Sequence, residues 1–140
     1  MEQQYVSYIR EQLHAVLGID SPSGCTEEVQ QYLCDTLRAM GYAPRRLVKG
    51  GVHVTLGGEG EPLTLLAHAD TLGAVVQYIK PNGRLAISNM TLNVHNAEAE
   101  NVKVITRFNG AYEGTLQLCN ASVHVNPDPN QARDLNKNME

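Results

Sequence analysis

The stretch that decides the fold is Leu63-Thr64-Leu65-Leu66-Ala67-His68-Ala69-Asp70-Thr71-Leu72-Gly73. Its first five residues are apolar at nearly every position, which is typical of a β-strand covered on both faces. The run ends in His68-Ala69-Asp70, and residues two apart on a strand point to the same face. Open α/β sheets place their sites at the carboxyl ends of central strands. The stretch therefore predicts a buried central strand that carries an imidazole and a carboxylate to a candidate site.

The carboxylate of Asp70 gives His68 a possible metal-binding chemistry. If Asp70 accepts the proton of one ring nitrogen, it fixes the tautomer and leaves the other nitrogen free to bind a metal ion. The same three residues also fit a strand-end histidine that is bonded locally beside a surface aspartate, because three-residue patterns often arise by chance. The spacing around His68 therefore leaves both interpretations open.

Two helices are expected before this strand. The first has one apolar stripe that ends at Gly18, formed by Val6, Ile9, Leu13, Val16 and Leu17. Turn and cap formers fill residues 20–24. The second helix has Glu27 and Glu28 in its first turn and a stop at Gly41, and its stripe consists of Val29, Leu33, Leu37 and Met40. After Gly41 the pattern changes to alternation, and residues 46–49 and 52–56 predict a hairpin around Gly50-Gly51.

From Gly73 onward, short strands replace helices. We expect strands at 74–79, 84–88, 102–106, 112–118 and 123–125, with turns at 81–83 and 109–110, and a loop from Asn126 to the end. This spacing is typical of a small barrel or sandwich. The shift in composition divides the chain into an α/β part, residues 1–72, and an all-β part, residues 73–140. The α/β part has too few strands to close a sheet, so further chain or a partner must complete it.

Composition excludes several classes of function. The chain has 140 residues and a formal charge of −4 without a basic block, which argues against nucleic-acid binding. No apolar run approaches the roughly 20 residues that a membrane span needs, and the polar N-terminus does not read as a secretion signal. The three cysteines, Cys25, Cys34 and Cys119, are widely spaced and fit free thiols in a reducing compartment. We therefore expect a cytoplasmic protein with no nucleic-acid or membrane partner.

Other histidines and cysteines favour structural interpretations. His53 alternates with two valines and is expected to face solvent on the hairpin, and His124 lies between two valines as a structural residue. Cys25 is expected to have a capping or core role, because no paired base can be identified. The cysteines lack Cys-x-x-Cys spacing, so the sequence shows no second group of metal donors.

The motifs taken together resemble the tetrahedral-aminopeptidase family, the glutamyl and deblocking aminopeptidases that form family 42 of the metallopeptidases. Its early signatures are the Pro-Ser-Gly-x-x-Glu-Glu opening at residues 22–28 and His-x-Asp-x-x-Gly at residues 68–73. Residues 74–85 resemble the entry into that family's inserted β-barrel domain, and residues 121–125 resemble another family segment. The chain departs from the pattern at Thr71-Leu72, where many members have Glu-Ile. It departs again at residues 90–92, where a Gly-Gly pair is expected.

This resemblance implies a fold, a site and a chemistry. Residues 1–72 would be the N-terminal part of a di-zinc aminopeptidase catalytic domain, and residues 73–140 an incomplete β-barrel-like oligomerisation domain. His68 would bind one of two divalent ions, zinc or cobalt. Asp70 would be a residue of the catalytic site and would orient the His68 ring. A metal-activated water would remove N-terminal residues from peptide substrates, in a homo-oligomer.

The resemblance also implies that the chain is inactive by itself. The family's remaining metal ligands and its glutamate general base come from later sequence. The chain is thus expected to be an N-terminal portion of a hydrolase. Two alternatives stay open: a non-catalytic binding or assembly module derived from such a peptidase, and an unrelated small α+β domain in which His-x-Asp is accidental.

Overall fold

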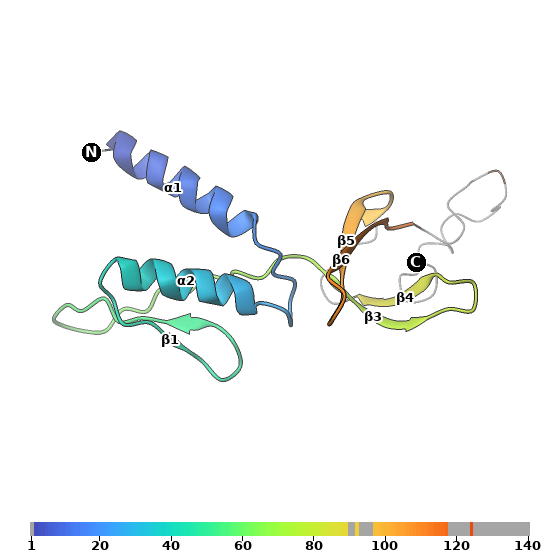
Figure 1. Ribbon diagram of the computed structural model, residues 1–140. Coiled ribbons are helices and arrows are strands. Elements are labelled where there is room, and N and C mark those ends of the chain that lie inside the picture. Colours follow the sequence, from blue (N-terminus) through green and yellow to red (C-terminus); the bar gives the residue numbers. More distant parts are fainter. Residues whose placement is uncertain (1, 90–91, 93–96, 118–123, 125–140) are drawn as a thin grey trace. The chain divides into compact units, whose positions relative to one another are not determined.

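The computed structural model describes residues 2–89, 92, 97–117 and 124, and the chain divides into two compact units, Met1–Thr71 and Leu72–Glu140. The first unit contains α1 (Glu2–Leu17), α2 (Glu27–Ala39), β1 (Arg45–Arg46) and β2 (Val52–His53) (Figure 1). The second contains β3 (Ala74–Ile79), β4 (Leu85–Asn89), β5 (Asn101–Ile105) and β6 (Ala111–Thr115). The mixed α/β class is as predicted. The described strands form three separate antiparallel pairs, β1–β2, β3–β4 and β5–β6, and do not by themselves show a barrel.

Helix α1 forms over the predicted residues, and most of its apolar stripe is exposed. Val6, Ile9, Leu13 and Leu17 each expose more than half of their surface. The hydroxyl of Tyr32 on α2 donates a hydrogen bond of 2.9 Å to Gln12 Oε1 on α1. A polar contact therefore links the two helices, while α1 keeps an uncovered apolar face. Among the described residues, neither helix has the length and hydrophobicity that a membrane span requires.

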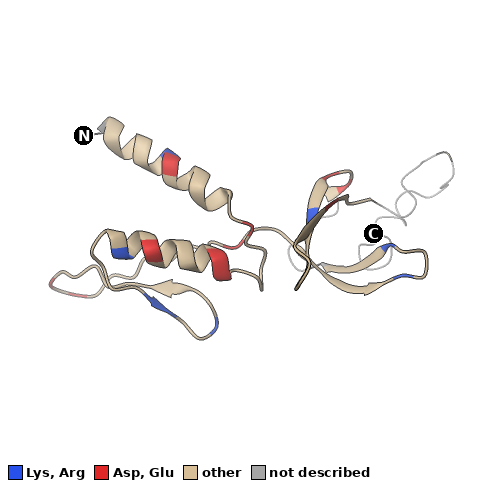
Figure 2. Ribbon diagram, viewed as in Figure 1, with Lys and Arg blue, Asp and Glu red and all other residues tan. Residues whose placement is uncertain are grey.

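Helix α2 has the sequence signals of both its ends. Acidic residues occupy its first turn and Arg38 its last turn, which complements the helix dipole (Figure 2). Gly41 has a φ of 88° and its amide donates to the Arg38 carbonyl, while the Tyr42 amide donates to the Leu37 carbonyl. This pair of bonds is a Schellman motif, which glycine favours because the left-handed conformation strains other residues. Val29 and Cys34 of α2 are almost completely buried and give this unit its core.

The β1–β2 hairpin is shorter than predicted. Arg45 pairs with His53 and Arg46 with Val52, and the Leu47 amide then donates to the Gly51 carbonyl to close the turn. The Arg46 guanidinium donates to the Glu27 carbonyl and to Gln31 Oε1, each at 3.0 Å. These bonds hold the hairpin against the start of α2.

The predicted central strand at residues 63–67 does not form a ladder, and the prediction that both its faces are buried is wrong for this chain. Leu63, Leu65 and Leu66 are 86%, 82% and 93% exposed. In the part of the chain that the structure describes, the continuation of this segment forms one isolated β-bridge, between Thr71 and Pro22. A strand needs neighbouring backbone to pair with, and the described residues offer none to 63–67.

The second unit consists of two hairpins that share a small core. Strand β3 pairs with β4 around the predicted turn, with an irregularity between Val76 and Tyr78, and β5 pairs with β6 in regular register. The core cluster contains Ala97 and Leu116 with partly buried Ile87, Leu92 and Val102. Of the predicted strand 123–125, His124 alone is described, as part of a turn. Cys119 and the tail from Asn126 lie outside the described residues. The division into a catalytic part, 1–72, and an oligomerisation part, 73–140, stays a prediction.

Candidate metal-binding site

The candidate site lies where the segment 67–71 meets the loop before α2. The Thr71 amide donates to the Ser21 carbonyl at 2.8 Å, and the Ser21 hydroxyl donates to the Ala69 carbonyl at 2.9 Å. Ser21 is completely buried. Two bonds from one residue therefore fix the backbone on both sides of Asp70, although the two segments are far apart in sequence.

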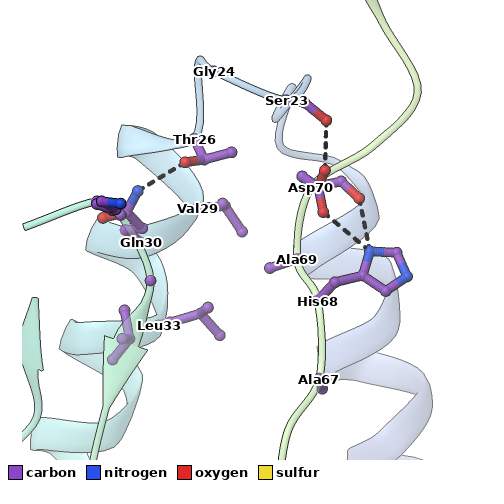
Figure 3. A pocket seen from close by; sticks show the side chains of 14 residues that line it. Ser23, Gly24, Thr26, Val29, Gln30, Leu33, Ala67, His68, Ala69 and Asp70 are labelled. Atoms are coloured by element: carbon purple, nitrogen blue, oxygen red, sulfur yellow. Dashed lines mark hydrogen bonds and ion pairs between the residues drawn. The ribbon is translucent and has the colours of Figure 1, made fainter. Parts of the chain in front are cut away.

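The structure brings His68 and Asp70 together, as the sequence predicts (Figure 3). His68 Nδ1 lies 3.2 Å from Asp70 Oδ1 and 3.1 Å from the Asp70 carbonyl oxygen. Both oxygens can only accept hydrogen bonds, so their position assigns the proton to Nδ1. In the neutral ring, Nε2 then carries the free lone pair that a metal ion requires. The His68 side chain is 86% exposed, which leaves Nε2 accessible.

The other carboxylate oxygen of Asp70 is also bonded. The Ser23 hydroxyl donates to Asp70 Oδ2 at 2.5 Å (Figure 3). This bond is the main reason that the pKa of Asp70 lies below its ordinary value. Partial desolvation opposes the shift, and the hydrogen bond from His68 adds to it. Asp70 is thus held as a carboxylate with one partner on each oxygen.

A hollow opens beside these residues within the first unit. It has a volume of about 360 Å³, and its walls include Val29 and Gln30 of α2, the Gly50-Gly51 turn, and Ala67 to Asp70. Gln30 is buried, and its Nε2 donates to Thr26 Oγ1 at 2.7 Å. Ala69 faces α2 across this hollow, whereas the His68 ring and the Asp70 carboxylate project from the opposite side of the segment (Figure 3).

The part of the chain that the structure describes does not form a complete metal site. It contains no group of three or more histidine, cysteine, aspartate or glutamate side chains placed to hold an ion. A zinc site needs three or four protein donors, and His68 offers one. Asp70 has both oxygens engaged by Ser23 and His68, so it fits the role of an orienting residue. The single imidazole donor is compatible with a metal ion that is also bound by further residues.

The sequence also singles out other histidines and cysteines, and their exposure differs. His53 is exposed on β2, where its Nδ1 accepts a hydrogen bond of 3.3 Å from Arg45 Nε, and the prediction that it faces solvent is confirmed. His124 is exposed. Cys25 and Cys34 are free thiols, exposed and buried respectively. Cys25 therefore has no core role, whereas Cys34 does.

Sequence reasoning did not identify Ser21 and Ser23 as partners of the site. It assigned the segment Ser21–Gly24 to turn and cap formation, because serine, proline and glycine are typical of turns. The signal that was available is the Pro-Ser-Gly motif itself, which recurs with His-x-Asp in the family that the chain resembles. Nothing in the local pattern shows that the two motifs touch.

Comparison with known proteins places the chain among the peptidases. Residues 50–140 match the sequence model of the M42 glutamyl aminopeptidase family, and the chain belongs to this family. It is also similar to the Bacillus subtilis (strain 168) protein named "Putative aminopeptidase YhfE", with 35% identity over 133 residues. That match covers 93% of this chain and 38% of the relative, so the chain spans less than half of the relative's length.

Proposed function

We propose that this chain is the N-terminal portion of a metal-dependent aminopeptidase in which His68 is a metal ligand. The observation that carries the proposal is the contact between His68 Nδ1 and Asp70, which directs the proton to Nδ1 and leaves Nε2 exposed. Membership of the M42 family supports peptidase activity. The name of the Bacillus relative supports peptide substrates that are shortened from their N-terminus.

Each site residue has a distinct task in this proposal. His68 supplies a neutral imidazole nitrogen, and Asp70 holds the proton on the opposite nitrogen, which fixes the ring and raises its basicity. Divalent ions of this kind, when bound, activate water and polarise the scissile carbonyl. We assign two ions, zinc or cobalt, to the complete enzyme, since imidazole binds both. Asp70 acts through His68.

The remaining metal ligands must come from polypeptide other than the described residues. The exposed leucines at 63, 65 and 66 and the uncovered stripe of α1 form apolar surface that water solvates poorly. Further chain that pairs with residues 63–67 would bury this surface and complete a sheet. We therefore propose that the 140 residues alone do not catalyse peptide hydrolysis.

The second unit is the proposed assembly region. Its strand β3 exposes Val75, Val76, Tyr78 and Ile79 at 42% to 70% of their surface. Exposed apolar side chains on a hairpin are suited to association with other strands. On this ground we propose that residues 73–140 belong to a β-barrel-like domain that supports a homo-oligomer.

The free thiols agree with a reducing compartment. Cys25 is exposed and unpaired, and Cys34 is buried and unpaired. Thiols persist in this state where glutathione and thioredoxin keep them reduced. We propose the cytoplasm as the location of the protein.

The test compares His68→Ala with His53→Ala in the protein as its gene encodes it. Bound metal and the hydrolysis of aminoacyl-p-nitroanilides are measured for both variants. We expect His68→Ala to weaken metal binding by more than about 100-fold, because loss of an outer partner alone costs about 10- to 100-fold. His53 is the matched control, since it is an exposed histidine bonded to Arg45. Unchanged metal binding and hydrolysis in His68→Ala would contradict the proposal.

One observation favours a second candidate, a non-catalytic assembly module. The described residues hold one histidine–aspartate pair and no complete group of donors. If the encoded protein self-associates but neither retains metal nor cleaves aminoacyl-p-nitroanilides, the assembly function replaces the enzymatic one.

A further inference from the structure

Asp70 has a second bonded partner that comes from a distant segment. The Ser23 hydroxyl donates to Oδ2, while Oδ1 faces His68 Nδ1 at 3.2 Å. A carboxylate that is bonded at one oxygen can still rotate about its terminal torsion, which has a broad minimum. Bonds at both oxygens restrict that rotation. The position of Oδ1, and with it the bond to His68, therefore depends on Ser23.

The orientation of the His68 ring depends on these hydrogen bonds. Its side chain is 86% exposed, so it has little packing to hold it. Its recorded partners are the carboxylate and the carbonyl of Asp70, both contacting Nδ1. A group that fixes the Asp70 carboxylate thus also fixes the direction of Nε2.

The loop itself does not need the Ser23 hydroxyl for its shape. The turn is closed by the Cys25 amide, which donates to the Pro22 carbonyl at 2.8 Å, and Gly24 has the positive φ of 88° that this turn requires. The N-cap of α2 is Thr26. Ser21 holds the backbone around Asp70 through bonds to residues 69 and 71. The hydroxyl of Ser23 is therefore free to bond the Asp70 side chain.

We propose that Ser23 is a positioning residue of the candidate site, which holds the Asp70 carboxylate so that His68 keeps its proton on Nδ1 and presents Nε2. The metal-binding role of this arrangement rests on the proposed function of His68. The hydrogen-bonded order Ser23–Asp70–His68 is a property of the chain itself, and it can be tested without a metal ion.

The experiment measures the tautomer of His68 in the full chain without metal, by long-range ¹H–¹⁵N correlation at about pH 8.5, where an imidazole is neutral. Ser23→Val and Ser23→Thr form a matched pair, since they have the same shape and only threonine keeps the hydroxyl. We expect Ser23→Thr to keep the Nδ1–H form of the unmodified chain and Ser23→Val to shift the ring towards the Nε2–H form. Equal tautomer populations in the two variants would overturn the proposal.

A second measurement tests the proposal even if the Ser23→Val substitution disturbs the loop. Zinc affinity is measured for Ser23→Ala, Ser23→Thr and the unmodified protein, each as its gene encodes it. We expect Ser23→Ala to bind zinc about 10-fold more weakly, at the lower end of the effect of outer partners, and Ser23→Thr to bind as the unmodified protein does. Equal affinity in all three, in a protein whose His68→Ala variant loses its metal, overturns the positioning role. If His68→Ala keeps its metal while the tautomer still follows Ser23, the proposed function fails and the positioning of His68 by Ser23 stands.

Discussion

The Thr71 amide donates a hydrogen bond of 2.8 Å to the Ser21 carbonyl, and this bond attaches the end of the segment that carries His68 and Asp70 to the loop before α2. The parallel bridge between Pro22 and Thr71 lies at the same point. Residues 63–67, which precede the site, have no ladder of their own among the described residues. The geometry of the candidate site is therefore set by the loop before α2.

Replacing Ser21 by alanine should loosen this attachment. The Ser21 hydroxyl is buried and donates to the Ala69 carbonyl, so its removal leaves that carbonyl without this partner. We expect Ser21→Ala to lower the free energy of unfolding of the first unit by about 1 kcal/mol, the ordinary net contribution of one hydrogen bond. Faster hydrogen exchange at the Thr71 amide, measured by NMR, would show that the loss is local.

Ser7→Ala is the matched control for this prediction. Its hydroxyl also donates to a backbone carbonyl, that of Gln3 at 3.0 Å, but it lies on the exposed surface of α1. We expect a change within about 0.5 kcal/mol, as for most surface substitutions. A loss of the same size in both variants would mean that the buried contact has no special role in holding the site.

Replacing Asp70 by asparagine should weaken metal binding and leave the fold intact. The amide keeps the shape of the side chain but loses the charge that stabilises the proton on His68 Nδ1. We expect zinc affinity to fall by about 10- to 100-fold, as with other partners that orient a metal-bound histidine. Competition titration with a chelating dye measures the affinity, and Asp35→Asn, on the outer surface of α2, is the control. Equal affinities in the two variants would contradict the role of Asp70.

Local signals in the sequence predict much of this chain because they act over a few residues. Helix α2 begins with acidic residues and ends with a Schellman motif at Gly41, and both signals can be read without knowing the rest of the fold. The same holds for β3–β4, where the Gly83 amide bonds to the Lys80 carbonyl within a turn that the sequence marks. Elements whose boundaries are set by neighbouring residues are thus the ones predicted most closely.

Asp35 should make the stability of the first unit depend on pH. Gln31 donates to its carboxylate at 2.7 Å and Arg38 at 2.8 Å, and the hydrogen bond from Gln31 is the main cause that lowers the pKa of Asp35 below the ordinary 3.8. The unfolded chain then binds a proton more readily than the folded one, so this stabilisation is present above pH 3.8 and is lost as the pH falls through the lower, folded value.

Thermal melts of the unmodified chain and Asp35→Asn test this sign. We expect the variant to melt at a lower temperature at about pH 7, by a small amount because the group is at the surface, and the difference to vanish in strong acid, where both side chains are neutral. A difference that grows on acidification would contradict the expected linkage.

Contacts between distant segments are what the sequence does not reveal. The bond from Ser23 to Asp70 joins residues from two motifs, and no periodicity or spacing connects them. The error at residues 63–67 has the same origin. An apolar run shows that burial is favoured, but the pairing of a strand depends on which backbone lies beside it. The imidazole–carboxylate contact could be predicted because its two residues are two positions apart.

Leu65→Ser should change the free energy of unfolding differently in the 140-residue chain and in the protein as its gene encodes it. In this chain Leu65 is 82% exposed, so the substitution should change the free energy of unfolding by less than about 0.5 kcal/mol. If further polypeptide covers residues 63–67, as proposed, the same substitution should cost about 3 kcal/mol there, because it removes a buried leucine and introduces a hydroxyl. Denaturant unfolding of both forms measures this contrast.

Val29→Ala is the control, since Val29 is fully buried in α2 and its truncation should lower stability in either form by about 2 kcal/mol. A small effect of Leu65→Ser in both forms would mean that the apolar run stays in contact with water, and the proposed completion of the sheet would then be wrong.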